Sequence, residues 1–256
     1  MTVAIAIGSQ KGGVAKTTTC LSLGACLADM GQLVLLIDMD PQTNLTLSMG
    51  LNLANLRHTV SEALLGNTSL VSVSREGAAF GLDIVPGSPE LAVLGKVLNG
   101  RTDSEFYLER SLEAMEEGLY DVVLIDCPPS FDLLTLNALT AADLLIIPTQ
   151  CEYYAAHALR RTIELAEMVR EKTNPHLVYR VLVTMYDQRN RICRVILNWL
   201  QRGLDGFLFD TVIEVDTKLR ESPVFGKPIT CYAPDTRGAQ QYRALAEELM
   251  RHDKDE

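Results

Sequence analysis

Residues 8–18 read GSQKGGVAKTT, and this stretch decides the fold of the chain. It joins an apolar run, Val3–Gly8, that we expect to form a buried strand to a periodic segment, Thr17–Met30, that we expect to form a helix. A glycine-rich turn in this context lets backbone N–H groups surround an anion, and the helix N-terminus adds partial positive charge. Lys16 can reach the phosphates of a nucleotide and the Thr17 hydroxyl can ligate Mg²⁺. The stretch therefore predicts a phosphate-binding loop.

Strand and helix patterns alternate along the rest of the chain. We expect further strands at Leu33–Asp38, Leu82–Pro86, Asp121–Asp126, Leu144–Thr149, Leu177–Thr184 and Phe207–Ile213. We expect further helices at Thr59–Leu65, Pro89–Leu98, Ser104–Glu117, Leu133–Ala142, Tyr153–Lys172, Ile192–Arg202 and Arg237–Met250. Near-continuous apolar strands separated by helices are typical of a parallel sheet covered on both faces. The sequence predicts one α/β domain over residues 1–256, with a mostly parallel, twisted sheet and helices on both faces.

Two expected strands end in carboxylates near the loop. Asp38 and Asp40 end one of them, separated by a single residue, so both side chains would overhang the loop if the pleat continues. A carboxylate there can hold water-bound Mg²⁺ or orient an attacking water. Asp126 ends another apolar strand, which is the Walker-B arrangement that contacts the water shell of magnesium. Ligands of parallel sheets bind at this edge.

Composition and charge exclude several other classes of protein. The longest apolar runs, such as Leu33–Ile37, are far short of the ~18–20 residues that span a bilayer, and no secretory signal is visible. The net charge of −10 argues against a surface covered by nucleic acid. Between Arg180 and Arg243, however, ten basic residues stand against seven acidic ones, which allows a local basic face. The six cysteines show no metal spacing, and a reduced cytoplasm fits them best.

Lys11 is a second lysine in the loop, and one nucleotide in one subunit does not require it. Gln10 and Ala15 stand where G-x-x-x-x-G-K-[ST] has glycines. Lys11 resembles the signature lysine of the deviant Walker-A ATPases, whose loop is K-G-G-x-x-K-[ST]. Together with the segments Asp38–Gln42 and Asp126–Ser130, the loop resembles that of the ParA/MinD superfamily of P-loop ATPases.

The rest of the chain extends this resemblance to the ParA/Soj-type chromosome partition ATPases. The segments that carry it are Val183–Asp187, Lys218–Pro223, Phe225–Ile229, Tyr232-x-Pro234 and Gly238-Ala239-x-x-Tyr242. The resemblance thus covers essentially the whole chain and implies a P-loop NTPase fold.

The resemblance also implies roles for individual residues. Lys16 would bind phosphate, Asp40 would orient the hydrolytic water, and Lys11 would complete the site of a partner subunit in an ATP-sandwich dimer. The catalytic residues implied are Lys11, Lys16 and Asp40, and the metal group is Thr17, Asp38 and Asp126. The nucleotide-binding residues implied are Lys11, Gly12, Gly13, Val14, Ala15, Lys16, Thr17, Thr18, Asp38, Asp126, Met185, Ile213, Val215 and Asp216. Near the adenine the family usually has I-P-x-N, and this chain has Ile213-Glu214-Val215-Asp216.

The function implied is that of a partition ATPase. With ATP and Mg²⁺ it would dimerise, bind nonspecific DNA, and hydrolyse ATP when stimulated by a ParB-like partner, in the cytoplasm on the nucleoid. The DNA-binding residues implied are Arg189, Arg191, Arg194, Lys218, Arg220, Lys227 and Arg237. Only about seven residues precede the loop, so we expect no N-terminal helix-turn-helix domain.

Three alternatives keep the same fold. The ATPase could position a protein cargo, such as a carboxysome or a chemoreceptor cluster, on the nucleoid. A MinD-like membrane ATPase needs a basic amphipathic C-terminal helix, whereas residues 245–256 are acidic on balance and have no bulky aromatic side chain. A reductase resembling the nitrogenase iron protein needs cysteines that converge on a cluster, and Cys127 is better interpreted as a packed residue. An amide-forming synthetase is a second form of this third, metabolic alternative.

Overall fold

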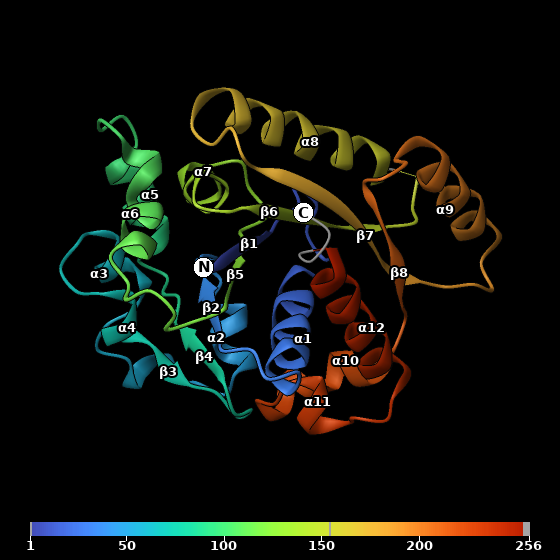
Figure 1. The fold of residues 1–256 in the computed structure, drawn as a ribbon, viewed down its shortest axis with the longest axis horizontal. Coiled ribbons are helices and arrows are strands. Elements are labelled where there is room, and N and C mark those ends of the chain that lie inside the picture. Colours follow the sequence, from blue (N-terminus) through green and yellow to red (C-terminus); the bar gives the residue numbers. More distant parts are fainter. Residues whose placement is uncertain (1, 154, 253–256) are drawn as a thin grey trace.

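The computed structural model describes residues 2–153 and 155–252, and within them eight strands form one sheet (Figure 1). The strand order is β3-β4-β2-β5-β1-β6-β7-β8. Every neighbouring pair is parallel except β3–β4. The strands are β1 Val3–Ile7, β2 Val34–Asp38, β3 Arg75–Glu76, β4 Leu82–Val85, β5 Val122–Asp126, β6 Leu144–Gln150, β7 Val178–Tyr186 and β8 Leu208–Glu214. The mostly parallel sheet predicted from the sequence is confirmed.

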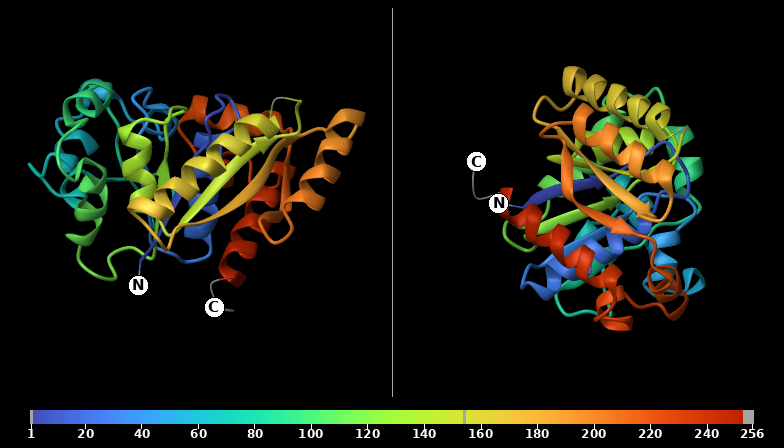
Figure 2. Two further views of the ribbon diagram at one scale, coloured as in Figure 1. Left: turned by 90° about the horizontal axis from the view of Figure 1, so that it is seen from above. Right: turned by 90° about the vertical axis from the view of Figure 1, so that its right-hand side faces the viewer.

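Helices cover both faces of the sheet (Figure 2). Ala4 and Ala6 of β1 pack in a core with residues of α3 to α9. Ile5 and Ile7, which alternate with them, pack in a second core with α1, α2, α10, α11 and α12. The helices are α1 Lys16–Asp29, α2 Asn44–Ser48, α3 Val60–Leu64, α4 Leu70–Val73, α5 Leu91–Leu98, α6 Tyr107–Glu113, α7 Leu133–Thr140, α8 Ala155–Lys172, α9 Arg191–Gly203, α10 Thr217–Glu221, α11 Ile229–Tyr232 and α12 Arg237–His252.

Helices α1 and α12 pack side by side on one face of the sheet (Figure 1). The Thr19 hydroxyl of α1 lies 3.0 Å from the Tyr242 hydroxyl of α12, and both side chains are fully buried. On its other side α1 approaches β2 at Gly24, where an added Cβ would lie 2.7 Å from Leu36 Cδ2. Glycine at this position lets the helix lie against the sheet.

The C-terminal helix is tied to the sheet edge by a buried ion pair. Glu248 accepts hydrogen bonds from Arg180 Nη2 at 2.9 Å, from the Asp210 N–H at 2.9 Å and from the Thr211 N–H at 3.0 Å. The Arg180 guanidinium also lies 3.8 Å above the Phe209 ring centroid. Arg180, the first cation of the basic segment noted in the sequence, therefore contributes to packing and not to a basic surface.

The differences from the expected elements are confined to short segments. Helices α2, α4, α10 and α11 each have only four or five residues, too few to show a helical period. The antiparallel edge strand β3 has two residues and no pattern at all. The helix expected at Tyr153–Lys172 is α8, which begins at Ala155; Tyr153 lies before it, and residue 154 lies outside the described part of the chain. The helix expected at Ser104–Glu117 is shorter, because α6 spans Tyr107–Glu113. In the described residues no helix is both long and apolar enough to cross a membrane.

Candidate nucleotide-binding site

The phosphate-binding loop leaves the middle of the sheet and meets the ends of two neighbouring strands. In the register of the sheet Asp126 lies opposite Ile7 of β1 and opposite Asp38 of β2. Since all three strands are parallel, the loop and both carboxylates gather at the carboxyl edge. The expected placement of the loop, Asp38 and Asp126 at one edge is therefore found.

The loop backbone passes twice through the left-handed region. Gly13 has φ of 72° and Ala15 has φ of 67°. Ala15, the residue before α1, adopts the conformation that the glycine of the standard motif adopts without strain, at a cost of roughly 1–2 kcal/mol. Contacts from the far side of the loop hold this shape. Thr184 Oγ1 donates to the Val14 carbonyl at 3.0 Å, and Gln150 Nε2 donates to the Gly13 carbonyl at 2.9 Å.

Lys16 is the lysine enclosed by the loop. Its side chain is buried, and Nζ donates to the Lys11 carbonyl at 3.3 Å. Burial lowers its pKa, whereas the nearby Asp126 and Asp40 carboxylates oppose that shift. A buried ammonium that donates to one carbonyl, as Lys16 does within the described part of the chain, suits phosphate oxygens as further partners.

Thr17 and Asp126 form the part of the site that suits magnesium. Thr17 Oγ1 donates to Asp126 Oδ2 at 2.7 Å. Asp126 Oδ1 is buried and has no hydrogen-bond partner among the described residues. No group of three or more candidate metal ligands exists in residues 2–153 and 155–252. Mg²⁺ commonly binds one or two protein oxygens together with water and phosphate, so this pair fits it.

Both carboxylate oxygens of Asp38 accept hydrogen bonds from residues that follow β2. Oδ2 accepts from the Thr46 N–H at 2.9 Å and from Thr46 Oγ1 at 2.6 Å, and Oδ1 accepts from the Asp40 N–H at 3.2 Å. Burial raises the pKa of Asp38 to about 6, and the Thr46 hydrogen bonds oppose the rise. These contacts fix the chain that follows β2. They support a positioning role for Asp38, in addition to the expected place near the metal.

Asp40 lies beside the loop and is nearly buried. Oδ1 accepts from the Gln42 N–H at 2.9 Å, and burial raises its pKa, against the Lys16 charge. Asp40 Oδ2 accepts no hydrogen bond within the described part of the chain. This carboxylate has the position and the open acceptor that orienting a water requires.

The Lys11 ammonium has different partners from that of Lys16. Its ammonium donates to Gln150 Oε1 at 2.9 Å and forms an ion pair with Glu152 at the surface. Gln150, which also binds the loop carbonyl, was not predicted from the sequence. Its place at the carboxyl end of β6 was the available signal.

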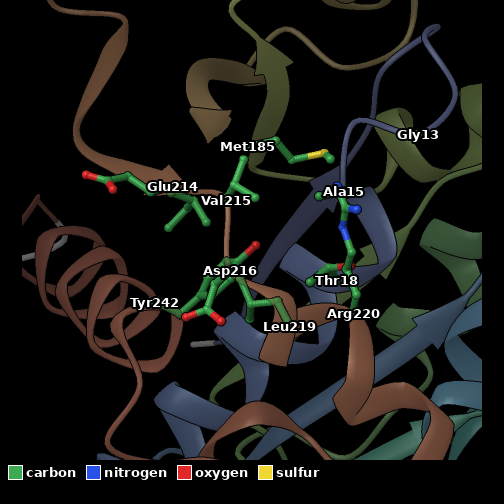
Figure 3. A pocket seen from close by; sticks show the side chains of 11 residues that line it. Gly13, Ala15, Thr18, Met185, Glu214, Val215, Asp216, Leu219, Arg220 and Tyr242 are labelled. Atoms are coloured by element: carbon green, nitrogen blue, oxygen red, sulfur yellow. The ribbon is translucent and has the colours of Figure 1, made fainter. Parts of the chain in front are cut away.

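A cavity of about 230 Å³ adjoins the loop on the side of β7 and β8 (Figure 3). Its wall contains four of the residues expected near adenine, namely Met185, Ile213, Val215 and Asp216, together with Gly13, Ala15 and Thr18 of the loop. Leu219, Arg220 and Tyr242 line it as well and were not assigned to the base, although Arg220 was expected to bind DNA. The structure brings the predicted base segment and the phosphate-binding loop into one pocket.

The expected DNA-binding residues divide into two groups. Four have partners within the chain: Arg189 with Asp187, Lys218 with Glu221, Arg194 with the Gln188 carbonyl, and Arg237 with Glu214 and the Val215 carbonyl. For the exposed side chains of Arg191, Arg220 and Lys227, no hydrogen bond or ion pair is found in the described part of the chain. All seven belong to segments that follow β7 or β8 in the chain.

Known proteins resemble this chain over its whole length. A family model for an AAA domain (AAA_31) matches residues 2–179. The sporulation initiation inhibitor protein Soj of Bacillus subtilis is 40% identical over 246 residues, which cover 96% of this chain and 97% of Soj. The chromosome partitioning protein ParA of Caulobacter vibrioides is 38% identical over 253 residues, 98% of this chain and 95% of ParA.

A solved structure agrees with the fold. Cobyrinic acid a,c-diamide synthase from Mycobacterium smegmatis, with a bound ATP analogue and magnesium, has a TM-score of 0.87 and 35% identity. The match covers 99% of this chain and 96% of that one. The chain therefore belongs to the ParA/Soj family of ParA/MinD-type P-loop ATPases.

Proposed function

We propose that this chain is a DNA partition ATPase that alternates between an ATP-bound dimer on DNA and a released monomer. The observation that carries this proposal is that the two loop lysines lie in different environments. Lys16 is enclosed by the loop, whereas Lys11 is partly exposed and binds Gln150 and Glu152. A partly exposed lysine at this position can exchange the exposed Glu152 carboxylate for the phosphates of a second subunit. The likeness to Soj and ParA over nearly the whole chain supports the same function.

The residues of one subunit supply most of the hydrolytic site. Lys16 and the loop amides would bind the phosphates. Thr17 and Asp126 would hold Mg²⁺, which would supply positive charge near the phosphate oxygens. Asp40 accepts a hydrogen bond from the attacking water through its open oxygen and orients it. Lys11 adds positive charge to the phosphates of the partner subunit, so full activity requires the dimer.

We assign nonspecific DNA binding to the segments of the chain that follow β7 and β8. Arg191, Arg220 and Lys227 are exposed there and, in the described residues, have no carboxylate to leave, so they are the first candidates for phosphate contacts. Arg189 and Lys218 would first have to leave Asp187 and Glu221. Dimerisation would double this set of cations, which explains why binding to DNA would need ATP.

The test is a mobility shift of a random-sequence DNA duplex with ATP·Mg²⁺, with ADP, or without nucleotide. The expected result is a shift with ATP only that is lost in Lys16→Ala and weakens steeply with salt. Lys96→Ala, an exposed lysine on α5, is the matched control. Absence of a shift under every condition would contradict the proposal, and a parallel arm with anionic vesicles would then detect a MinD-like membrane activity.

The partner would be a ParB-like protein bound to chromosome or plasmid DNA, and a protein cargo is the alternative. Stimulated phosphate release on addition of a candidate partner distinguishes these two. The likeness to a diamide synthase also raises ATP-dependent amide formation as a second candidate. ATP hydrolysis that depends on DNA and partner, without a carboxylate substrate or an amide donor, would argue against that reaction.

A further inference from the structure

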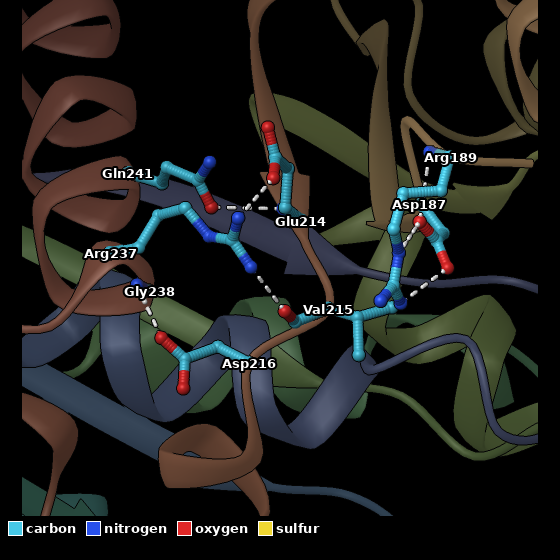
Figure 4. A network of polar contacts seen from close by, with 8 residues as sticks. All are labelled: Asp187, Arg189, Glu214, Val215, Asp216, Arg237, Gly238 and Gln241. Atoms are coloured by element: carbon cyan, nitrogen blue, oxygen red, sulfur yellow. Dashed lines mark hydrogen bonds and ion pairs between the residues drawn. The ribbon is translucent and has the colours of Figure 1, made fainter.

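The base-side wall of the nucleotide pocket is held by the first turn of α12 (Figure 4). Arg237 Nη1 forms an ion pair with Glu214 Oε2 at 2.6 Å, and Arg237 Nη2 donates to the Val215 carbonyl at 2.7 Å. One guanidinium thus binds two successive residues of the wall. Glu214 stands at the position where the family usually has proline, and a proline there could not form this ion pair.

Two neighbouring contacts reinforce the same junction. The Gly238 N–H donates to Asp216 Oδ2 at 2.8 Å, and the Glu214 N–H donates to Gln241 Oε1 at 2.9 Å. Asp216 Oδ1 meanwhile accepts from the Lys218 N–H at 2.9 Å and caps α10. Both Asp216 oxygens are therefore engaged by backbone amides. Asp216, which we expected to bind the nucleotide, is better described as a residue that fixes the chain between β8 and α10.

Arg237 is correspondingly unsuited to the role expected for it from the sequence. About half of its side chain is exposed, but its guanidinium already has an ion pair and a carbonyl acceptor, both short. A phosphate of DNA would have to replace the Glu214 carboxylate and would release the wall of the pocket. The contacts of Arg237 thus belong to the nucleotide pocket, on the side opposite the phosphate-binding loop.

We propose that Arg237 is a positioning residue that sets the base-facing wall Glu214–Asp216, and so determines the affinity for the base of ATP and not for its phosphates. Val215 and Asp216 line the pocket beside Met185, and Arg237 fixes the peptide that joins them. The phosphates are bound by the loop, which Arg237 does not touch. This inference rests on nucleotide binding at the proposed site, and it does not depend on DNA or partner binding.

The test compares two ligands by calorimetry, ATP·Mg²⁺ and inorganic tripolyphosphate·Mg²⁺. Only ATP carries a base, so Arg237→Ala should raise the Kd for ATP about tenfold and change the Kd for tripolyphosphate less than twofold. Arg237→Lys keeps the charge but cannot hold both acceptors, so its Kd for ATP should lie in between. Glu214→Gln removes the ion pair alone and should show a smaller loss of the same kind.

Arg243→Ala is the matched control, because Arg243 lies on the same helix and, among the described residues, its side chain binds the Pro234 carbonyl, at 2.6 Å, outside the pocket. It should change neither Kd. Equal losses for both ligands in Arg237→Ala would overturn the proposal, since they would indicate general damage to the site. Unchanged Kd values together with a lower salt slope of DNA binding would also overturn it and return Arg237 to the DNA surface. If Arg237→Ala does not fold, Glu214→Gln decides by the same comparison.

Discussion

Asp38 and Asp126 lie opposite one another at the ends of β2 and β5, and neither side chain has any exposed surface. Burial is the main cause that raises both pKa values. Coulombic repulsion from Asp38 and Asp40 adds to the rise for Asp126, and repulsion from Asp40 adds to the rise for Asp38. Two acids in adjacent parallel strands are an unfavourable arrangement for folding. Both carboxylates lie where a cation bound with the ligand is expected.

This arrangement predicts an unusual dependence of stability on pH. The pKa of Asp38 is raised to about 6 in the folded chain, whereas an unfolded aspartate titrates near 3.9. Between these values the folded state binds more protons, so the free energy of unfolding falls as pH rises from about 4 to 6, by about 3 kcal/mol. Urea unfolding of the nucleotide-free protein over this range measures it. Asp38→Asn should show a shallower fall, because Asp126 and Asp40, whose pKa values are also raised, still contribute to it. An equally steep fall in that variant would refute the assignment.

Asp40→Ala should separate binding from hydrolysis. Because Asp40 does not hold the loop and lies beside it, the variant should bind ATP·Mg²⁺ and dimerise normally. Loss of the group that orients the water should lower turnover by at least about 100-fold. Phosphate release and sedimentation velocity give the two readouts. Asp205→Ala, an exposed change near the end of α9, is the control, and turnover near the wild-type rate in Asp40→Ala would remove Asp40 from the mechanism.

Lys11→Ala should lose the dimer and keep the nucleotide. The Glu152 ion pair that the change removes lies at the surface, so the free energy of unfolding should fall by at most about 1 kcal/mol. ATP binding by the monomer should persist, because Lys16 and the loop amides remain. Sedimentation with ATP·Mg²⁺ reports the dimer. A dimer of wild-type stability in Lys11→Ala would contradict the role of Lys11 across the subunit boundary.

The basic side chains should differ in their effect on DNA binding. Removal of Arg191, Arg220 or Lys227 should each lower the salt slope of DNA affinity by about 1, as expected for the loss of one phosphate contact. The Lys96→Ala control should leave the slope unchanged. Slopes that change only with Arg189 and Lys218 would mean that the ion-paired residues are the true contacts.

Glu248 should matter for stability far more than its neighbour. Glu248→Ala would leave the buried Arg180 guanidinium and two backbone N–H groups without their acceptor, which costs about 3–5 kcal/mol. Glu247→Ala, one residue earlier on the same helix and exposed, should cost less than about 0.5 kcal/mol. Chemical denaturation of the two variants makes the comparison, and similar losses would refute the importance of the pair.

The sequence was sufficient for the parallel sheet and for the phosphate side of the site, because both depend on local patterns. A strand, a glycine loop and Lys16-Thr17 are contiguous, and the carboxyl-edge rule places Asp126 beside them. The base side could not be predicted at the same level. The contacts of Asp216 and Arg237 depend on where α12 returns to the sheet, 22 residues along the chain, and no local pattern encodes that return. The buried contact of Arg180 could not be predicted for the same reason, since its partner Glu248 is 68 residues away.

The hydroxyl contact between Thr19 and Tyr242 has a consequence for the energetics of ligand binding. Helix α1 begins at the phosphate-binding loop and α12 begins at the base-side wall, and this contact joins the two helices in the core. The two halves of the nucleotide site are thereby held at a fixed separation before any nucleotide arrives. Less conformational entropy would then be lost on binding, so more of the free energy of the phosphate and base contacts would be available for affinity and for assembly of the proposed dimer.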